Sequence, residues 1–257
     1  MLSGVSIDLH SHVLPSLDDG AESLEVAVAI CEAAVVDGTT IIAATPHVRW
    51  DYPTTPAKMK QTLGRVRRAV KTLPIEILPG GEIALEQLEL PIDTLREFAL
   101  AGNPDYLLVE TPYFDWPSSL VPQLARLTAL GITPVLAHPE RNRIAQRTPR
   151  LVFEAVEAGA LVQLTAASLD GRTGRSAESA AKKLLQNELA HLVASDAHHP
   201  DVRAVGLSSV AAVVGEELGT WLTHAVPLAI VRGTPLPPRP GRSRKSALSR
   251  LLGGPEA

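Results

Sequence analysis

Short apolar runs alternate along most of the chain with longer segments of helical periodicity. The apolar runs predict seven strands, at residues 6–10, 40–44, 75–78, 106–110, 133–137, 161–164 and 191–194. Most of these runs are almost continuously apolar, which is typical of parallel strands that are buried on both faces.

Between the strands, apolar residues recur at the spacing of amphipathic helices. The pattern predicts helices at residues 23–36, 58–73, 117–130, 149–158 and 175–189, and one or two more within 202–222. In the first helix we expect a buried stripe that ends before Gly38 and consists of Leu24, Val28, Cys31 and Val35.

The alternating order of strands and helices predicts an α/β protein with a parallel sheet. With seven strand–helix units and no visible break, a single-domain closed or distorted barrel is favoured, and a doubly wound open sheet is the alternative. The last segment differs in composition, because residues 235–257 are rich in Pro, Gly and Ser. We predict a folded domain at 1–234 and a disordered basic tail at 235–257, with Arg239, Arg242, Arg244, Lys245 and Arg250.

Composition excludes some classes of function. The net charge is -4 over 257 residues, which gives no electrostatic case for nucleic-acid binding by the folded part. Cys31 is the single cysteine, so an intramolecular disulfide is impossible, as is usual in a reducing compartment. The first residues lack the features of a signal peptide, and no apolar run reaches the ~18 residues of a membrane span. We therefore expect a cytoplasmic protein without a membrane span.

Polar clusters follow the predicted strands, at the ends where a parallel barrel carries its active site. The six clusters are Asp8-Leu9-His10-Ser11-His12, Thr45-Pro46-His47, Gly80-Gly81-Glu82, Glu110-Thr111-Pro112, Ala137-His138-Pro139-Glu140-Arg141 and Ser195-Asp196-Ala197-His198-His199. In the first cluster, Asp8, His10 and His12 alternate along a strand and are expected to share a face. Two such imidazoles can bind one metal ion, although an isolated His-x-His pair is often incidental.

The other histidines strengthen this interpretation. Of the eight histidines, five lie at or just beyond predicted strand ends, together with Glu82, Glu110 and Asp196; these five are His10, His12, His47, His138 and His198. His191 and His224 lack this context, and His199 is left unassigned. Mixed imidazole and carboxylate ligands suit Zn²⁺, Mn²⁺ or Fe²⁺ better than Ca²⁺. Because one catalytic ion takes about three protein ligands, the set predicts two or three ions with a bridging carboxylate.

At these motifs the sequence resembles the PHP (polymerase and histidinol phosphatase) superfamily and, within it, the CpsB/CapC-type bacterial tyrosine-protein phosphatases of capsule and exopolysaccharide loci. The resemblance covers residues 6 to about 210, and its most specific parts are Asp18-Asp19-Gly20 and His138-Pro139-Glu140-Arg141. Residues Val48-Arg49-Trp50-Asp51 depart from the family's usual loop, and the basic tail is not part of the resemblance.

The resemblance implies a distorted (β/α)7 barrel, the PHP fold, that holds three metal ions, often manganese. It implies that one ion is held by His10, His12 and Asp196, with Glu82 bridging to a second ion. It further implies that the second ion is completed by Glu110 and His138, and that the third is held by Asp19, His47 and His198. Arg141 and Arg203 match positions that are expected to bind phosphate.

These features predict a metal-dependent phosphatase that hydrolyses phosphotyrosine with metal-activated water. The expected substrate is a phosphotyrosine protein, namely a tyrosine autokinase of polysaccharide export. The alternative is a small-molecule phosphatase, for example of histidinol phosphate, that uses the same metal site. A non-catalytic binding module is disfavoured by the full ligand set, and a nuclease by the acidic net charge. Cys31 is predicted to be a core residue and not a nucleophile, because it lies on the apolar stripe of a helix.

Overall fold

The computed structural model describes residues 5–241 of the chain. Its strands are β1 (Ser6–Ser11), β2 (Thr39–Ala44), β3 (His47–Val48), β4 (Glu76–Pro79), β5 (Glu82–Ile83), β6 (Tyr106–Glu110), β7 (Thr133–Ala137), β8 (Leu161–Thr165) and β9 (Leu192–Ala194). The α-helices are α1 (Leu24–Val36), α2 (Pro56–Ala69), α3 (Ile92–Arg96), α4 (Leu120–Ala129), α5 (Arg150–Glu157), α6 (Ala166–Leu169), α7 (Arg175–Gln186), α8 (Val210–Val214), α9 (Glu216–Thr220) and α10 (Val226–Arg232). A π-helical turn, η5 (Trp221–Ala225), joins α9 to α10.

All seven predicted strands are confirmed, with ends that shift by one residue at most. The five predicted helices before residue 200 are also confirmed, within a few residues at each end. The last helical prediction is confirmed, because α8 and α9 both lie within 202–222, but the helical region continues beyond this range through η5 and α10 to residue 232. The first residues of the range are not helical, because Arg203 and Gly206 have left-handed backbone angles, with φ of 53° and 78°.

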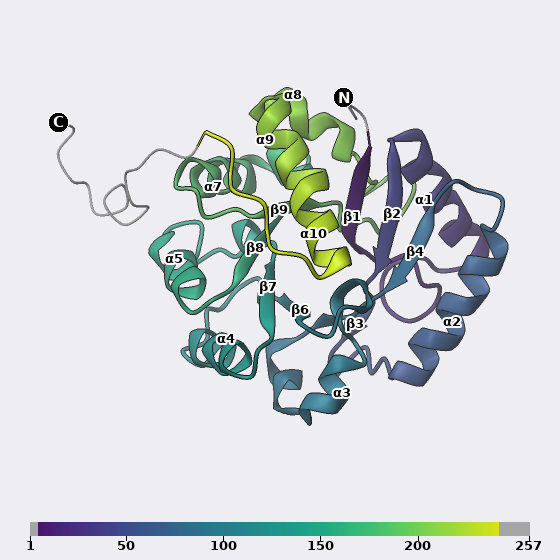
Figure 1. Ribbon diagram of the computed structural model, residues 1–257, viewed down its shortest axis with the longest axis horizontal. Helices are drawn as coiled ribbons and strands as arrows, with labels where there is room; N and C mark the ends of the chain where they lie inside the picture. The colour runs from purple at the N-terminus through teal and green to yellow at the C-terminus, as the bar shows by residue number, and fades with distance from the viewer. Residues whose placement is uncertain (1–4, 242–257) are drawn as a thin grey trace.

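The strands form two parallel sheets, in the orders β1-β2-β4 and β3-β5-β6-β7-β8-β9. Figure 1 shows α1 and α2 beside the first sheet and α4, α5 and α7 along the second. The protein is therefore a mixed α/β fold with parallel sheets, and within residues 5–241 the strand ladders do not close into one ring. Two backbone bonds still link the sheets: His12 N donates to Ala197 O over 2.8 Å, and Asp196 N donates to His10 O over 2.8 Å.

The chain passes from the first sheet to the second at two short turns. Thr45-Pro46 separates β2 from β3, and Gly80-Gly81 separates β4 from β5. A Cβ atom added to Gly81 would lie 3.0 Å from the Phe98 side chain, so the second turn has little room for a larger residue. Both crossings end at polar site residues, and in the β3–β5 ladder His47 pairs with Glu82.

The buried face of α1 differs from the predicted stripe. Ala27, Ile30, Cys31 and Ala34 are buried, whereas Leu24, Val28 and Val35 are only partly buried. Residues 24–36 are apolar on nearly every face, so periodicity alone did not indicate which side meets the sheet. The core position of Cys31 is confirmed, and burial raises the pKa of its thiol to about 12.

The first part of the predicted tail lies against the domain. Trp221 Nε1 donates to Pro237 O over 3.1 Å, and Arg239 Nη1 donates to Ala190 O over 2.7 Å. Arg242, Arg244, Lys245 and Arg250 lie outside the described residues. Within residues 5–241, no helix has both the length and the apolar character needed to cross a membrane.

Candidate metal centre

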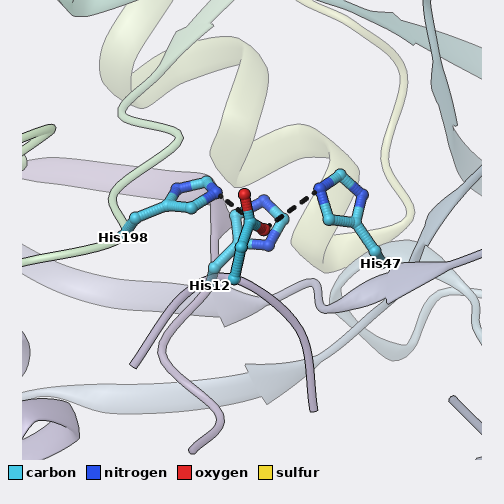
Figure 2. A group of neighbouring side chains, drawn as sticks. His12, His47 and His198 are labelled. Atoms are coloured by element: carbon cyan, nitrogen blue, oxygen red, sulfur yellow. Dashed lines mark ion pairs between the residues drawn. The ribbon is translucent and has the colours of Figure 1, made fainter. Parts of the chain in front are cut away.

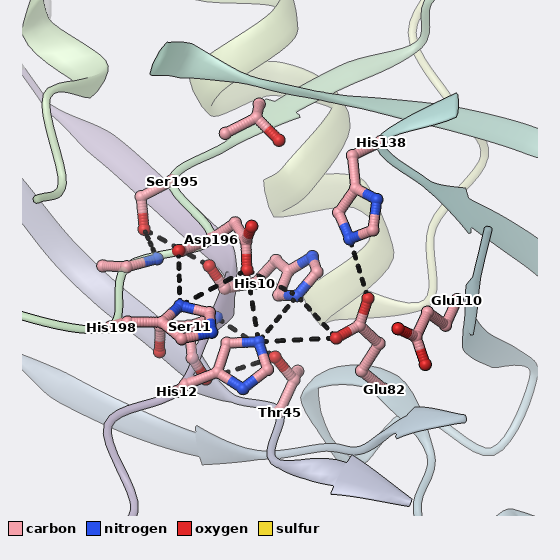
Figure 3. Close-up of polar contacts among 12 residues, drawn as sticks. His10, Ser11, His12, Thr45, Glu82, Glu110, His138, Ser195, Asp196 and His198 are labelled. Atoms are coloured by element: carbon pink, nitrogen blue, oxygen red, sulfur yellow. Dashed lines mark hydrogen bonds and ion pairs between the residues drawn. The ribbon is translucent and has the colours of Figure 1, made fainter. Parts of the chain in front are cut away.

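Nine side chains that the sequence singled out as metal ligands meet at the carboxyl ends of the strands. Figure 3 labels all of them except Asp19 and His47. They are His10, His12, Asp19, His47, Glu82, Glu110, His138, Asp196 and His198. Eight are buried, and Asp19 is 46% exposed at the mouth of the site. Residues from six separate parts of the chain therefore occupy one small, largely dry volume.

Glu82 is at the centre of this group. Its Oε2 lies 3.0 Å from His47 Nδ1, 3.3 Å from His10 Nε2 and 3.4 Å from His12 Nε2. Its Oε1 lies 2.9 Å from His138 Nε2. One fully buried carboxylate thus faces four imidazoles.

Two other carboxylates complete the arrangement. Asp196 Oδ1 lies 3.4 Å from His10 Nε2 and 3.2 Å from His12 Nε2. Asp19 Oδ1 lies 3.5 Å from His47 Nε2 and 3.4 Å from His198 Nε2. Figure 2 shows the His47 and His198 rings on either side of His12. Asp196 therefore faces two rings from the end of β1, whereas Asp19 faces two rings that follow different strands.

Several of these buried atoms have no hydrogen-bond partner, namely His47 Nδ1, Glu82 Oε2, Asp196 Oδ1 and His198 Nε2. Buried polar atoms are almost always hydrogen-bonded, so this cluster needs an explanation. Two ligands that each bind one ion at about 2 Å are separated by roughly 3–4 Å, which is the spacing seen here. The potential ligand atoms form four overlapping groups, each within 4.8 Å: His12, Asp19, His47 and His198; His10, His138 and Asp196; His10, His12 and Glu82; and His47, Glu82 and Glu110. This donor set fits divalent metal ions.

Hydrogen bonds to the outer ring nitrogens orient three of the histidines. His10 Nδ1 lies 2.9 Å from Gln163 Oε1, His12 Nδ1 lies 2.7 Å from Asp18 Oδ2, and His198 Nδ1 lies 2.8 Å from Asp196 O. Each contact occupies Nδ1 and leaves Nε2 facing the centre, as is usual for metal-binding histidines. The roles of Gln163 and Asp18 were not predicted, although Gln163 is a polar residue inside a largely apolar strand.

Asp8 holds the site together without facing the centre. Its carboxylate accepts bonds from Ser195 N over 3.0 Å and from Ser195 Oγ over 2.5 Å. It thereby ties β1 to the loop after β9, which carries Asp196. Burial raises the pKa of Asp8 to about 6.

The pKa shifts favour the metal-binding forms of Glu82, Asp196 and His138. They favour the protonated forms of Glu110, His10 and His12, whose pKa values are raised. Burial alone would raise the pKa of Glu82 and Asp196, but His10 and other nearby cationic groups hold both pKa values well below the usual range. Burial lowers the pKa of His138 to about 4, which keeps that ring neutral. Burial and the neighbouring Glu82 raise the pKa of Glu110. Ionised carboxylates and neutral imidazoles are the forms that bind metal ions.

Three arginines contact the carboxylates of the centre. Arg141 Nη1 donates to Asp196 Oδ2, and Arg203 Nη2 donates to the same oxygen over 2.7 Å. Arg49 Nη1 donates to Glu110 Oε1 over 3.0 Å. The contact of Arg49 was not predicted, because it depends on how the loop after His47 folds back.

The remaining histidines lie outside the centre, since none of the four ligand groups found within residues 5–241 includes them. His191 Nδ1 accepts a bond from Val162 N over 3.1 Å, and His199 Nδ1 accepts one from Asp201 N over 3.2 Å. His224 lies on the π-helical turn η5.

The backbone at Gly20 lies so close to the backbone of His12 that only glycine fits. A Cβ atom at this position would lie 2.2 Å from His12 O, far inside van der Waals contact. The neighbouring Asp18 and Asp19 are thereby held close to the end of β1. Three other residues of the site, His138, Asp196 and Arg203, have left-handed φ values of 38°, 55° and 53°. Such backbone strain in residues other than glycine is characteristic of functional sites.

The substitution Gly20→Ala is expected to lower the free energy of unfolding by about 2 kcal/mol or more, because the loop must move away from His12. Chemical denaturation measures this change. The control is Gly64→Ala within α2, where an added Cβ atom meets only Arg68 Nη1 at 3.5 Å. This control should raise stability by roughly 0.5–1 kcal/mol. Equal effects of the two variants would contradict the steric argument.

Comparisons with known proteins agree with this geometry. The family model for capsular polysaccharide synthesis, CpsB/CapC, matches residues 6–228. Tyrosine-protein phosphatase YwqE of Bacillus subtilis (strain 168) is 34% identical over 249 residues, which cover 93% of this chain and 98% of the relative. Putative tyrosine-protein phosphatase CapC of Staphylococcus aureus is 32% identical over 195 residues, covering 75% of this chain and 76% of the relative.

A solved structure is similar over almost the whole chain. It comes from crystallographic work on YwqE of Bacillus subtilis and CpsB of Streptococcus pneumoniae, described there as unique metal-dependent tyrosine phosphatases. The TM-score is 0.81 at 32% sequence identity, and the match covers 92% of this chain and 100% of that chain.

Proposed function

The chain belongs to the CpsB/CapC family of capsular polysaccharide synthesis, and on that premise we propose that it is a metal-dependent tyrosine-protein phosphatase. The observation that carries the proposal is the group of buried ligands around Glu82, with Arg141 and Arg203 at its edge. This arrangement combines metal-binding side chains with two guanidinium groups that can bind phosphoryl oxygens.

We propose that the centre holds two or three divalent ions, with Mn²⁺ favoured over Zn²⁺ or Fe²⁺. His10, His12 and Asp196 would hold one ion, and Glu82 would bridge to a second. Glu110 and His138 would complete the second site, and Asp19, His47 and His198 would hold the third. The overlap of the four ligand groups through His10, His12, His47 and Glu82 supports ions that share ligands.

When bound, the ions supply a water of lowered pKa and neutralise charge on the phosphoryl group. Arg141 and Arg203 would bind two phosphoryl oxygens and orient the phosphoryl group in the centre. Both guanidinium groups already meet at Asp196 Oδ2, so they approach the centre from the same side. The leaving phenolate of tyrosine has a pKa of about 10 and therefore needs little protonation as it departs.

The proposed fold around this site is the distorted (β/α)7 barrel. The bonds from His12 N to Ala197 O and from Asp196 N to His10 O support it, because they join the first strand to the segment after the last. The proposed substrate is a tyrosine autokinase of polysaccharide export, and the proposed compartment is the cytoplasm, where a free Cys31 stays reduced.

The function is tested by comparing kcat/KM for a phosphotyrosine peptide and for histidinol phosphate, using protein purified with Mn²⁺. We expect the peptide to be the better substrate. Faster turnover of histidinol phosphate would favour the small-molecule phosphatase, and turnover of neither would contradict the proposal.

The substitution Cys31→Ser is expected to leave kcat/KM for the peptide within about twofold of the wild-type value. Cys31 is buried inside α1, and its raised pKa keeps the sulfur protonated. A buried hydroxyl in its place should cost roughly 1–2 kcal/mol of stability, measured by denaturation. Abolished activity in a folded variant would instead indicate a cysteine nucleophile.

A further inference from the structure

Exposed apolar side chains gather on the loops that carry the metal centre. The structure describes seven large exposed apolar residues within 5–241: Val36, Trp50, Phe114, Leu130, Ile144, Val202 and Val213. Trp50 and Ile144 each follow a site residue, His47 or Arg141, by three positions. Phe114 and Val202 follow Glu110 and His198 by four positions. Apolar side chains thus surround a strongly charged site, and exposed apolar groups of this kind are typical of binding surfaces.

Two cavities of about 350 Å³ flank the centre, and each contains one of these apolar residues. The first is lined by Trp50, Arg49, Glu86, Glu110 and Tyr113, among others. The second is lined by Val202, Arg203, Val26, Asp19, Glu22 and His198, among others. Since Glu110 is in one cavity and Asp19 and His198 are in the other, both cavities are continuous with the proposed metal site.

The loop that carries Trp50 is anchored on the metal centre. Arg49 and Tyr52 exchange backbone bonds of 3.2 and 3.1 Å, which close a tight turn around Trp50. The Arg49 guanidinium binds Asp51 over 2.6 Å and Glu110 over 3.0 Å, and the Tyr52 ring stacks on His47 with centroids 5.7 Å apart. The turn therefore fixes the backbone at Trp50, and the indole, which is 78% exposed, lies beside the site.

Most of the metal ligands are buried, whereas Trp50 and Val202 are exposed. The ligands His10, His12 and Glu82 are fully buried, so the phosphoryl group must be inserted while the polypeptide backbone stays at the mouth. Tyr113 stacks on His138 with centroids 5.8 Å apart and also lines the Trp50 cavity, so it connects that cavity to the ligands. Trp50 and Val202, which are 78% and 70% exposed, lie in the two flanking cavities and not among the buried ligands.

The charges indicate which side chains these cavities accept. In the Trp50 cavity, Arg49 is already paired with Asp51 and Glu110, while Glu86 adds a negative charge. In the Val202 cavity, Glu22 and Asp19 add negative charge, and the one arginine, Arg203, is already paired with Asp196. Neither cavity therefore favours an acidic side chain over an apolar one.

We propose that Trp50 and Val202 form two apolar subsites that bind apolar side chains on either side of the phosphotyrosine in a polypeptide substrate. This inference rests on the proposed phosphatase function and adds a sequence preference to it. The Trp50 subsite is the stronger of the two, because an indole buries more apolar area than an isopropyl group.

The experiment compares kcat/KM for two phosphotyrosine peptides, one with leucines and one with glutamates on both sides of the phosphotyrosine. Turnover of p-nitrophenyl phosphate, which has no flanking residues, gives the reference rate. The wild-type protein should prefer the leucine peptide. In Trp50→Ala, the ratio of the leucine-peptide rate to the reference rate should fall about tenfold, as is typical when an aromatic anchor is truncated. Val202→Ala should lower the same ratio by a smaller factor.

Two further variants make the result specific. Trp50→Phe keeps an aromatic ring and should recover most of the preference. Val36→Ala is the control, because Val36 is also exposed, at 89%, but lies at the end of α1 just before β2 begins. This position is at the amino ends of the strands, away from the site. The rate ratio of Val36→Ala should therefore equal that of wild type. An unchanged ratio in Trp50→Ala, or a wild-type preference for the glutamate peptide, would overturn the inference.

Failure of the proposed function gives a different result. A wild-type protein that hydrolyses neither the peptides nor p-nitrophenyl phosphate contradicts the phosphatase proposal itself. Calorimetric titration with leucine and glutamate peptides that carry a non-hydrolysable phosphonate then tests the subsites separately. Tighter binding of the leucine peptide by wild type than by Trp50→Ala supports them, and equal binding overturns them.

Discussion

Removal of divalent metal ions is expected to reduce hydrolysis of a phosphotyrosine peptide to background, and Mn²⁺ is expected to restore it. The reason is the donor set, because three imidazoles lie 3.0–3.4 Å from the buried carboxylate oxygen Glu82 Oε2. A bound ion can lower the pKa of water from 15.7 to about 7, and no side chain of the centre can replace that effect. Dialysis against a chelator, elemental analysis and peptide assays before and after Mn²⁺ addition measure the change.

Calcium is the control ion in this experiment, because it prefers oxygen ligands and is expected to restore little activity. Stability provides a second measurement. A free metal concentration one hundred times the Kd should stabilise the fold by about 2.7 kcal/mol, since the ion binds the folded state. Full activity in protein shown by elemental analysis to be free of metal would refute metal dependence.

The strands were predictable because most of them are buried on both faces. A strand of this kind is a continuous apolar run in the sequence. The two shortest strands, β3 and β5, have two residues each and are too short to give a periodic signal. They exist because the chain leaves the first sheet at Thr45-Pro46 and Gly80-Gly81, and the sequence does not show that these turns connect different sheets. The division of the strands into two sheets could therefore not be predicted from the sequence. In the second sheet, β3 pairs with β5, which places His47 beside Glu82.

The candidate ligands were visible for a similar reason: polar residues at the carboxyl ends of parallel strands converge whatever the details of packing. The residues that orient them were not visible, because their roles depend on contacts between distant segments. Gln163 reaches His10 from β8, and Arg49 reaches Glu110 across a turn that no local pattern predicts. The predicted buried stripe of α1 was wrong for a local reason. The helix is apolar on nearly every face, so the sequence does not distinguish its buried side from its exposed side.

The substitution Glu82→Gln is expected to lower kcat for the phosphotyrosine peptide on the order of 10³-fold and to lower the metal content of the protein. Glu82 is fully buried, and its two oxygens face the imidazoles of His10, His12, His47 and His138. Glutamine keeps the shape but has one oxygen and no charge, and its amide nitrogen does not bind metal ions. The variant therefore cannot bridge two ions.

The matched control is Glu140→Gln, which makes the same change at another fully buried carboxylate. Glu140 Oε1 accepts a bond from Thr165 N over 2.9 Å, and a glutamine oxygen can accept it equally well. Glu140 belongs to none of the four ligand groups among residues 5–241, so its variant should retain the metal content of wild type. Elemental analysis of both folded variants separates the loss of a bridging ligand from the general effect of burying an amide. If Glu82→Gln keeps the metal content of Glu140→Gln, Glu82 does not bridge the ions, and the ligand assignment around it is wrong.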